Sequence, residues 1–257
     1  MNYSGLKSTW QMQPSNIHFS YLTCSLLESW KHGFFTRQFY PAKPQELVSF
    51  LDIHADVYHI KQIHGNQVWT TSELSPKNPD SLSQGDGIVT SYPRQSVWVA
   101  SADCTPVLIG DLKTGRVAAV HAGWRGTAKN ILPITLERFL ELGSRREDLL
   151  VALGPAIEGD VYQVAEEVAK EVGSSLFDDD VLKNLAQLLP CPIQTDLMLG
   201  KIKLDVRFVN FHQLRQWGLK LEQIAIAPYC TYKNEESFYS YRRTGQKQVQ
   251  WSGIVSL

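Results

Sequence analysis

The chain lacks several features that would assign it to a class at once. Its 257 residues contain no apolar run of about 18 residues or more, so we expect no membrane-spanning helix. Basic and acidic residues almost balance, with a net charge of −1, and give no sign of a nucleic-acid or anionic membrane partner. Residues 1–19 lack the apolar core of a secretory signal. We therefore expect a cytoplasmic protein that binds neither nucleic acid nor membranes.

Cysteine is scarce and scattered. The four cysteines form no CxxC pair, so neither a zinc finger nor a dense disulfide framework is expected. In a cytosolic protein such a pattern favours free thiols, and any special cysteine would be catalytic or a metal ligand. The four are Cys24, Cys104, Cys191 and Cys230.

Hydrophobic residues make up 43% of the chain and charged residues 20%, as in ordinary globular proteins. Short apolar runs bounded by turn residues predict strands, and apolar residues at helical spacing predict helices. The order shows no regular βαβ rhythm, which favours an α+β fold with a mixed sheet. No linker-like stretch divides the chain, so we favour one domain. We expect strands within 56–70, 87–90, 96–101, 106–110, 116–121 and 223–227, helices over 128–142, 161–172, 180–189 and 204–217, and a polar loop over 72–85.

One cysteine lies between two histidines in places where side chains project into a site. Cys104 sits in a predicted bend between strands, and His121 ends a predicted strand. His64 stands beside Gly65. One thiolate and two imidazoles are the ligand set of a zinc site that keeps a fourth position open. The alternative is a buried inert thiol with two structural histidines.

Three further groups have a functional and a structural interpretation. Asp103 either orients a ligand imidazole or is an ordinary turn acid. The turn Gly123–Gly126 with Arg125 precedes a predicted helix, which favours an anion site; the alternative is a tight turn with a buried tryptophan. Residues 239–243 (Tyr-Ser-Tyr-Arg-Arg) form either a ring-stacking and anion-pairing wall or a solvated strand edge.

Taken together, the motifs resemble the laccase-domain family, also named multicopper polyphenol oxidoreductases and purine nucleoside phosphorylase/adenosine deaminase proteins. The resemblance implies an α+β fold in which mixed β-sheets form a sandwich-like core flanked by helices. It also implies a single domain over 1–257, with residues 1–28 as a variable N-terminal extension. The matching segments are Lys61-Gln62-Ile63-His64-Gly65, Asp86-Gly87-Ile88-Val89-Thr90, Ala102-Asp103-Cys104-Thr105-Pro106-Val107, Val120-His121-Ala122-Gly123-Trp124-Arg125-Gly126, Gly154-Pro155-Ala156-Ile157, Cys230-Thr231 and Phe238-Tyr239-Ser240-Tyr241-Arg242-Arg243.

The resemblance implies a zinc enzyme of purine nucleosides, with copper as the alternative metal. His64, Cys104 and His121 would bind the metal, and Asp103 would join Cys104 as a catalytic residue. The expected reactions are phosphorolysis of adenosine, inosine and related nucleosides, and hydrolytic deamination of adenosine. We expect a monomer or weak homo-oligomer whose partners are a purine nucleoside and phosphate. The residues expected to bind substrate or phosphate are Arg37, Gln62, Arg125, Tyr241 and Arg242.

One departure and three alternatives stay open. After Arg37, the family's Gly-Gly-x-Ser-like turn is replaced by Gln38-Phe39-Tyr40-Pro41, which puts contacts of that loop in question. A copper-dependent polyphenol oxidase is disfavoured because none of the seven histidines forms the His-x-His pair that a trinuclear centre uses. A metal-dependent amidase that edits cell-wall precursors would use the same site. A non-catalytic module would need a fourth ligand, for which Cys230 is the candidate.

Overall fold

The computed structural model describes residues 9–14, 19–74 and 82–257, and its centre is a pair of mixed six-stranded sheets. Most neighbouring strands are antiparallel, but β4–β7, β5–β6 and β10–β14 are parallel. The first sheet has the order β1 (Trp10–Pro14), β2 (Ser20–Cys24), β3 (His32–Phe35), β15 (Gln250–Val255), β7 (Gln95–Ser101), β4 (Asp56–His59). The second has the order β14 (Ile224–Ile226), β10 (Leu149–Leu153), β8 (Thr105–Asp111), β9 (Val117–Ala122), β6 (Gly87–Val89), β5 (Val68–Thr70).

The side-chain alternation of β8 shows how the layers stack. Successive residues of a strand point to opposite faces. Leu108 points into the layer between the two sheets, where it packs with Val97 and Val99 of β7. Val107 and Ile109 point the other way, toward the helices. A strand that is buried on both faces reads as one continuous apolar run, as residues 106–109 do.

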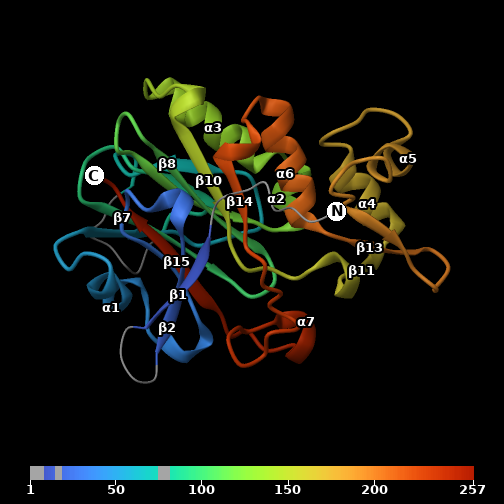
Figure 1. The fold of residues 1–257 in the computed structure, drawn as a ribbon, viewed down its shortest axis with the longest axis horizontal. Helices are drawn as coiled ribbons and strands as arrows, with labels where there is room; N and C mark the ends of the chain where they lie inside the picture. Colours follow the sequence, from blue (N-terminus) through green and yellow to red (C-terminus); the bar gives the residue numbers. More distant parts are fainter. Residues whose placement is uncertain (1–8, 15–18, 75–81) are drawn as a thin grey trace.

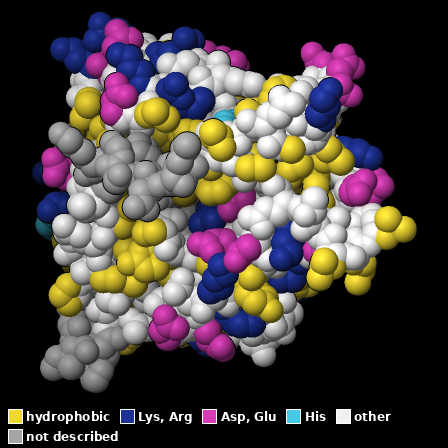
Figure 2. Space-filling model, turned by 45° about the vertical axis from the view of Figure 1, so that its right-hand side comes forward, with side chains coloured by type: hydrophobic (Ala, Val, Ile, Leu, Met, Phe, Trp, Pro, Cys, Tyr) yellow, Lys and Arg dark blue, Asp and Glu magenta, His cyan; other side chains and the backbone are white. Residues whose placement is uncertain are grey.

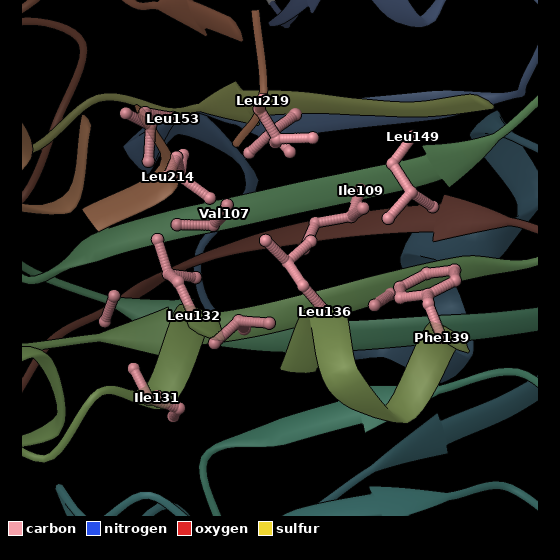
Figure 3. Close-up of a cluster of buried hydrophobic side chains, with 14 of the residues drawn as sticks. Val107, Ile109, Ile131, Leu132, Leu136, Phe139, Leu149, Leu153, Leu214 and Leu219 are labelled. Atoms are coloured by element: carbon pink, nitrogen blue, oxygen red, sulfur yellow. The ribbon is translucent and has the colours of Figure 1, made fainter. Parts of the chain in front are cut away.

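Two helices, α3 (Ile131–Glu141) and α6 (Val206–Trp217), cover the outer face of the second sheet (Figure 1). Figure 3 shows Leu132, Leu136 and Phe139 of α3 directed at the strands. Helix α6 begins after Asp205, whose carboxylate accepts the Arg207 N–H at 3.1 Å, and ends at Gly218, whose φ is +108°. The helix predicted over 204–217 and its glycine stop are therefore confirmed.

The remaining elements lie on the outer face of the first sheet and beside helices α2 (Trp124–Ala128) and α6. Aromatic and aliphatic side chains, among them Trp98 and Phe35, pack under α1 (Pro44–Leu47) and the adjoining 3₁₀ turns. A small third sheet packs beside α4 and α5 around a core of its own. Its strands are β11 (Gln163–Ala165), β13 (Lys201–Leu204) and β12 (Ile193–Thr195), and the other helices are α4 (Glu166–Gly173), α5 (Val181–Leu185) and α7 (Tyr241–Thr244). The 3₁₀ turns are Ser25–Leu27, Arg37–Phe39, Val48–Phe50, Arg146–Asp148, Gly159–Val161 and Leu221–Gln223.

The architecture confirms the predicted α+β sandwich flanked by helices, while several element boundaries were wrong. The strand predicted over 56–70 is two strands, β4 and β5, in different sheets, because the chain leaves the first sheet in the loop that carries His64. The helix predicted over 128–142 is broken at Asn130, whose φ is +59°. The helix predicted over 161–172 begins as strand β11, and the one over 180–189 shrinks to α5. Of the polar loop over 72–85, residues 75–81 lie outside the described residues.

The segment expected as an N-terminal extension, 1–28, contributes strands β1 and β2 to the first sheet. Residues 1–8 and 15–18 of it lie outside the described residues. Among the helices that the structure describes, none is both long enough and apolar enough to cross a membrane. Figure 2 shows basic and acidic side chains interspersed on one face, without a broad area of a single charge sign.

Candidate metal centre

The three residues predicted as metal ligands come together in the structure. One ligand atom each from His64, Cys104 and His121 lies within 4.8 Å of the others. The two imidazole rings are 4.8 Å apart and almost perpendicular, at 86°. The three residues come from three parts of the chain: His64 from the loop between β4 and β5, Cys104 from the turn between β7 and β8, and His121 from strand β9. A His–Cys–His cluster able to bind a metal is thus formed.

Pairing between neighbouring strands explains how distant residues meet. Strand β8 runs antiparallel to β9, with Thr105 opposite Ala122 and Pro106 opposite His121. Cys104 therefore lies one residue beyond the end of the ladder, beside Gly123. A Cβ atom on Gly123 would lie 2.8 Å from the Cys104 sulfur. The glycine of the predicted anion-binding turn is thus required by the sulfur atom, a reason the sequence did not reveal.

A buried carboxylate, Asp86, organises both histidines. Its Oδ1 accepts a hydrogen bond from His121 Nδ1 at 2.8 Å, which leaves Nε2 of that ring for a metal. The same carboxylate accepts the backbone N–H groups of His64 at 3.0 Å and Gly65 at 2.7 Å. The prediction that Asp103 orients an imidazole was wrong, because its carboxylate binds the Thr231 hydroxyl and the Arg242 N–H instead. Asp86 takes the role because it precedes β6, which pairs with β9.

Two residues at the cluster have a strained backbone conformation. His64 has a φ of +58° and Asp103 a φ of +97°, both in the left-handed region that side chains disfavour. Such residues cost about 1–3 kcal/mol each and persist only where surrounding contacts hold them. For His64 those contacts are the N–H groups bound by Asp86. For Asp103 they are the Thr231 hydroxyl on Oδ1 and the Arg242 N–H on Oδ2, both at 2.7 Å.

The charges of the cluster stabilise the ligand form of the cysteine. Burial alone would raise the pKa of the Cys104 thiol, but the charge and hydrogen bonds of His121 and His64 lower it to about 6. Burial alone would lower the pKa of His121, but the Cys104 thiolate and the Asp86 carboxylate raise it to about 9. The metal-free site therefore holds a thiolate–imidazolium pair at neutral pH.

These two pKa values predict how metal affinity depends on pH. Ligands must lose their protons to bind a metal. Above pH 6 the thiolate is present, but His121 stays protonated up to about pH 9, so a metal ion such as zinc would have to displace one proton. We expect the zinc association constant to rise about tenfold per pH unit between 6 and 9. Competition with a chromogenic chelator, calibrated at each pH, measures this; a constant affinity over that range would contradict the assignment.

A cleft of about 680 Å³ opens beside the cluster, which is within the usual size range of small-molecule sites. The three cluster residues line it together with Asp103, Trp124 and Tyr162. Cations line it as well: Arg125, Arg242 and Lys247. The Arg125 guanidinium lies 4.2 Å from the ring centre of Trp124, and that of Arg242 lies 4.6 Å from the ring centre of Tyr162. The two arginines are therefore supported by aromatic rings at the cleft wall.

The other predicted site residues divide between the cleft and its surroundings. Tyr241 lines the cleft and is exposed. Gln62 also lines it, but its amide is engaged: it donates to the Ala100 carbonyl at 2.8 Å and accepts the Ala100 N–H at 2.7 Å. Gln62 therefore fastens the loop before His64 to β7.

Arg37 is not among the residues that line the cleft. Its guanidinium donates to the Glu235 carbonyl at 2.8 Å and lies 4.6 Å from the ring centre of Tyr239. The atypical loop that follows it packs Phe39 into the aromatic cluster around Phe35. The structure thus does not bring Arg37 to the other predicted phosphate ligands.

Cys230, the candidate for a closing fourth ligand, lies apart from the cluster. Its buried sulfur accepts the Glu158 N–H at 3.3 Å. In the described parts of the chain, the metal-competent group of His, Cys, Asp and Glu consists of His64, Cys104 and His121. Three ligands leave a coordination position for substrate or water.

Comparisons with known proteins place the chain in a family. The family described as "Multi-copper polyphenol oxidoreductase laccase" matches residues 42–256. The chain belongs to this family. Among laccase-family relatives, a purine nucleoside phosphorylase of Synechocystis sp. is 51% identical, over 92% of this chain and 93% of its own. A purine nucleoside phosphorylase of Bacteroides thetaiotaomicron is 32% identical, over 82% of this chain and 74% of its own.

Two further proteins extend the comparison. A protein from an unknown prokaryote named adenosine deaminase RL5 is 31% identical, over 64% of this chain and 59% of its own. The solved structure of YlmD from Geobacillus stearothermophilus superposes with a TM-score of 0.80 over 95% of this chain and 98% of its own. At 21% identity that likeness shows the laccase-family fold alone.

Proposed function

We propose that this protein is a zinc-dependent purine nucleoside phosphorylase that converts adenosine, inosine and related nucleosides to the free base and ribose 1-phosphate. The observation that carries the proposal is the three-ligand His–Cys–His cluster at the wall of a cation-lined cleft. The relative that is 51% identical bears the name of this activity. The cleft volume suits a nucleoside together with phosphate.

Different residues of the cleft would bind the phosphate and transfer the proton. In phosphorolysis a phosphate oxygen attacks C1′ of the ribose, the glycosidic C–N bond breaks, and the base leaves with a proton. Arg125 and Arg242 are held on aromatic rings, which suits them to hold the phosphate dianion. Asp103 is the proposed acid–base residue, and its carboxylate also holds the Arg242 backbone in place.

The donor set fits zinc in its ligand types and in the carboxylate that orients one of the ligands. A thiolate and two imidazoles are ordinary zinc ligands, and Asp86 orients one imidazole as carboxylates do in zinc sites. When bound, the metal would supply Lewis acidity and would lower the pKa of water at the open position. Such water chemistry suits a second activity, hydrolytic deamination of adenosine at C6, and one relative is named for that reaction.

Copper-dependent oxidation of polyphenols, which the family description suggests, finds less support. The same ligands would also bind copper. A trinuclear centre needs many more histidines, and the metal-competent group in the described ranges contains two. The cell-wall amidase has no observation of its own in this structure.

An anaerobic assay of the zinc-loaded protein with adenosine and phosphate tests the proposal. We expect adenine and ribose 1-phosphate to form at the same rate with and without dioxygen, because phosphorolysis oxidises and reduces nothing. Omitting phosphate should stop formation of ribose 1-phosphate, while inosine should still form by deamination. Oxygen uptake with a phenol, and no product from adenosine, would contradict the proposal.

A further inference from the structure

A buried hydroxyl without a partner lies at the wall of the cleft. Ser101 is the last residue of β7, its side chain is 3% exposed, and it lines the cleft. Within the described residues its Oγ has no hydrogen-bond partner. Buried polar groups are almost always hydrogen-bonded, because an unmade bond costs free energy. The unpaired hydroxyl of Ser101 therefore indicates a hydrogen-bond partner that enters the cleft.

Strand alternation puts this hydroxyl beside the metal cluster. Val97 and Val99 of β7 face the layer between the sheets, and Ser101 continues their series. On the other sheet, Val117 and Ala119 face the same layer, and His121 continues theirs. Both series end at the cleft. An apolar residue at position 101 would complete the apolar layer, so packing does not call for a hydroxyl here.

Apart from the metal cluster, the cleft residues that come from the first sheet and from the segment before His64 carry no charge. Besides Ser101 they are Ile60, Ala100 and Trp251, and Gln62, whose amide is already bound to Ala100. The cations of the cleft come from α2, from α7 and from the segment 245–249 that follows α7. A phosphate dianion is attracted to the guanidinium groups, while a neutral polar ligand loses less hydration at the uncharged residues.

We propose that Ser101 is a specificity-determining residue whose Oγ hydrogen-bonds the neutral nucleoside and not the phosphate. The inference rests on the proposed function. A hydroxyl donates one hydrogen bond and accepts others. Ser101 can therefore pair with the donor edge of an aminopurine and with the acceptor edge of an oxopurine, which suits a cleft that takes both adenosine and inosine.

A matched pair of variants, Ser101→Val and Ser101→Thr, isolates the hydroxyl, because the two side chains share their shape. We expect Ser101→Val to raise the KM for inosine about tenfold, the effect of one lost hydrogen bond, and Ser101→Thr to stay near wild type. The KM for phosphate and the zinc content should be unchanged in both. Thermal unfolding of Ser101→Val should not fall below that of Ser101→Thr, since the variant removes an unpaired polar atom.

The outcomes separate this inference from the proposed function. Equal inosine KM values in the two variants, or a rise in the phosphate KM alone, would overturn the role of Ser101. A wild-type protein without turnover would overturn the proposed function, and calorimetric binding of inosine would then decide the inference. Weaker binding by Ser101→Val than by Ser101→Thr would support the contact. Equal binding, or no binding by the wild type, would refute it.

Discussion

Cys104→Ala is expected to abolish phosphorolysis and deamination together. The substitution removes the one anionic ligand of the three-residue cluster and leaves two imidazoles, a set too poor to hold zinc tightly. We expect zinc affinity to fall by at least about a hundredfold, more than the loss of an outer-shell partner causes. Metal analysis of the purified protein and turnover of adenosine with phosphate measure both effects.

Cys191→Ala is the matched control for this experiment. Cys191 is also a half-buried free thiol, but its Sγ contacts the Ile193 carbonyl at 3.0 Å, beside α5 and the third sheet. This variant should keep full zinc content and full turnover. The assignment of the cluster fails if Cys104→Ala also keeps both.

Asp86→Asn is expected to weaken metal binding about 10–100-fold, although Asp86 is not itself one of the proposed ligands. The amide cannot accept all the hydrogen bonds that the carboxylate takes from His121 and from the N–H groups of His64 and Gly65. His121 would lose its fixed tautomer, and the strained backbone of His64 would lose its support. We also expect a loss of about 2–3 kcal/mol in unfolding free energy, because buried donors are left unpaired.

Asp111→Asn is the control that separates metal binding from stability. Asp111 is as fully buried as Asp86, and its Oδ1 accepts the N–H groups of Lys113 and Thr114 at the opposite end of β8. This variant should lower stability and leave zinc affinity unchanged. If the two variants lost metal affinity equally, the effect of Asp86 would be one of general stability.

The pH dependence of stability follows from the same carboxylate. Burial raises the pKa of Asp86, but the hydrogen bond from His121 and the N–H groups of Gly65 and His64 outweigh it and lower the pKa. A group whose pKa is lowered on folding stabilises the protein above its unfolded pKa, and that stabilisation is lost as the pH falls. The contribution of Asp86 is therefore fully present at neutral pH.

Ligand chemistry was predictable from the sequence, but ligand support was not. His64, Cys104 and His121 stood out because their residue types form one donor set and because turns flank them. Asp86 acts through the pairing of β6 with β9, and no local pattern reveals which strand will become a neighbour. Arg37 matched a family motif, yet packing of the loop after it turns its guanidinium toward Glu235.

The same holds for the strands: those with a clear local pattern were predicted, and those that depend on a neighbouring strand were not. Strand β8 was predicted because its residues are apolar on both faces. Strand β15 was missed because it contains Ser252 and Gly253, which are typical of turns. Gly253 is needed there because a Cβ would lie 2.4 Å from the Trp98 ring of the neighbouring strand. That requirement becomes visible only when β7 and β15 are side by side.

The position of β15 also bears on the order in which the first sheet can assemble. This strand, residues 250–255, lies in the middle of the first sheet, between β3 and β7. Until these residues pair, the first sheet is split into two parts, β1–β2–β3 and β7–β4. Pairings between residues so distant in sequence form slowly and late in folding. We therefore expect the first sheet to be completed late, when β15 joins its two parts.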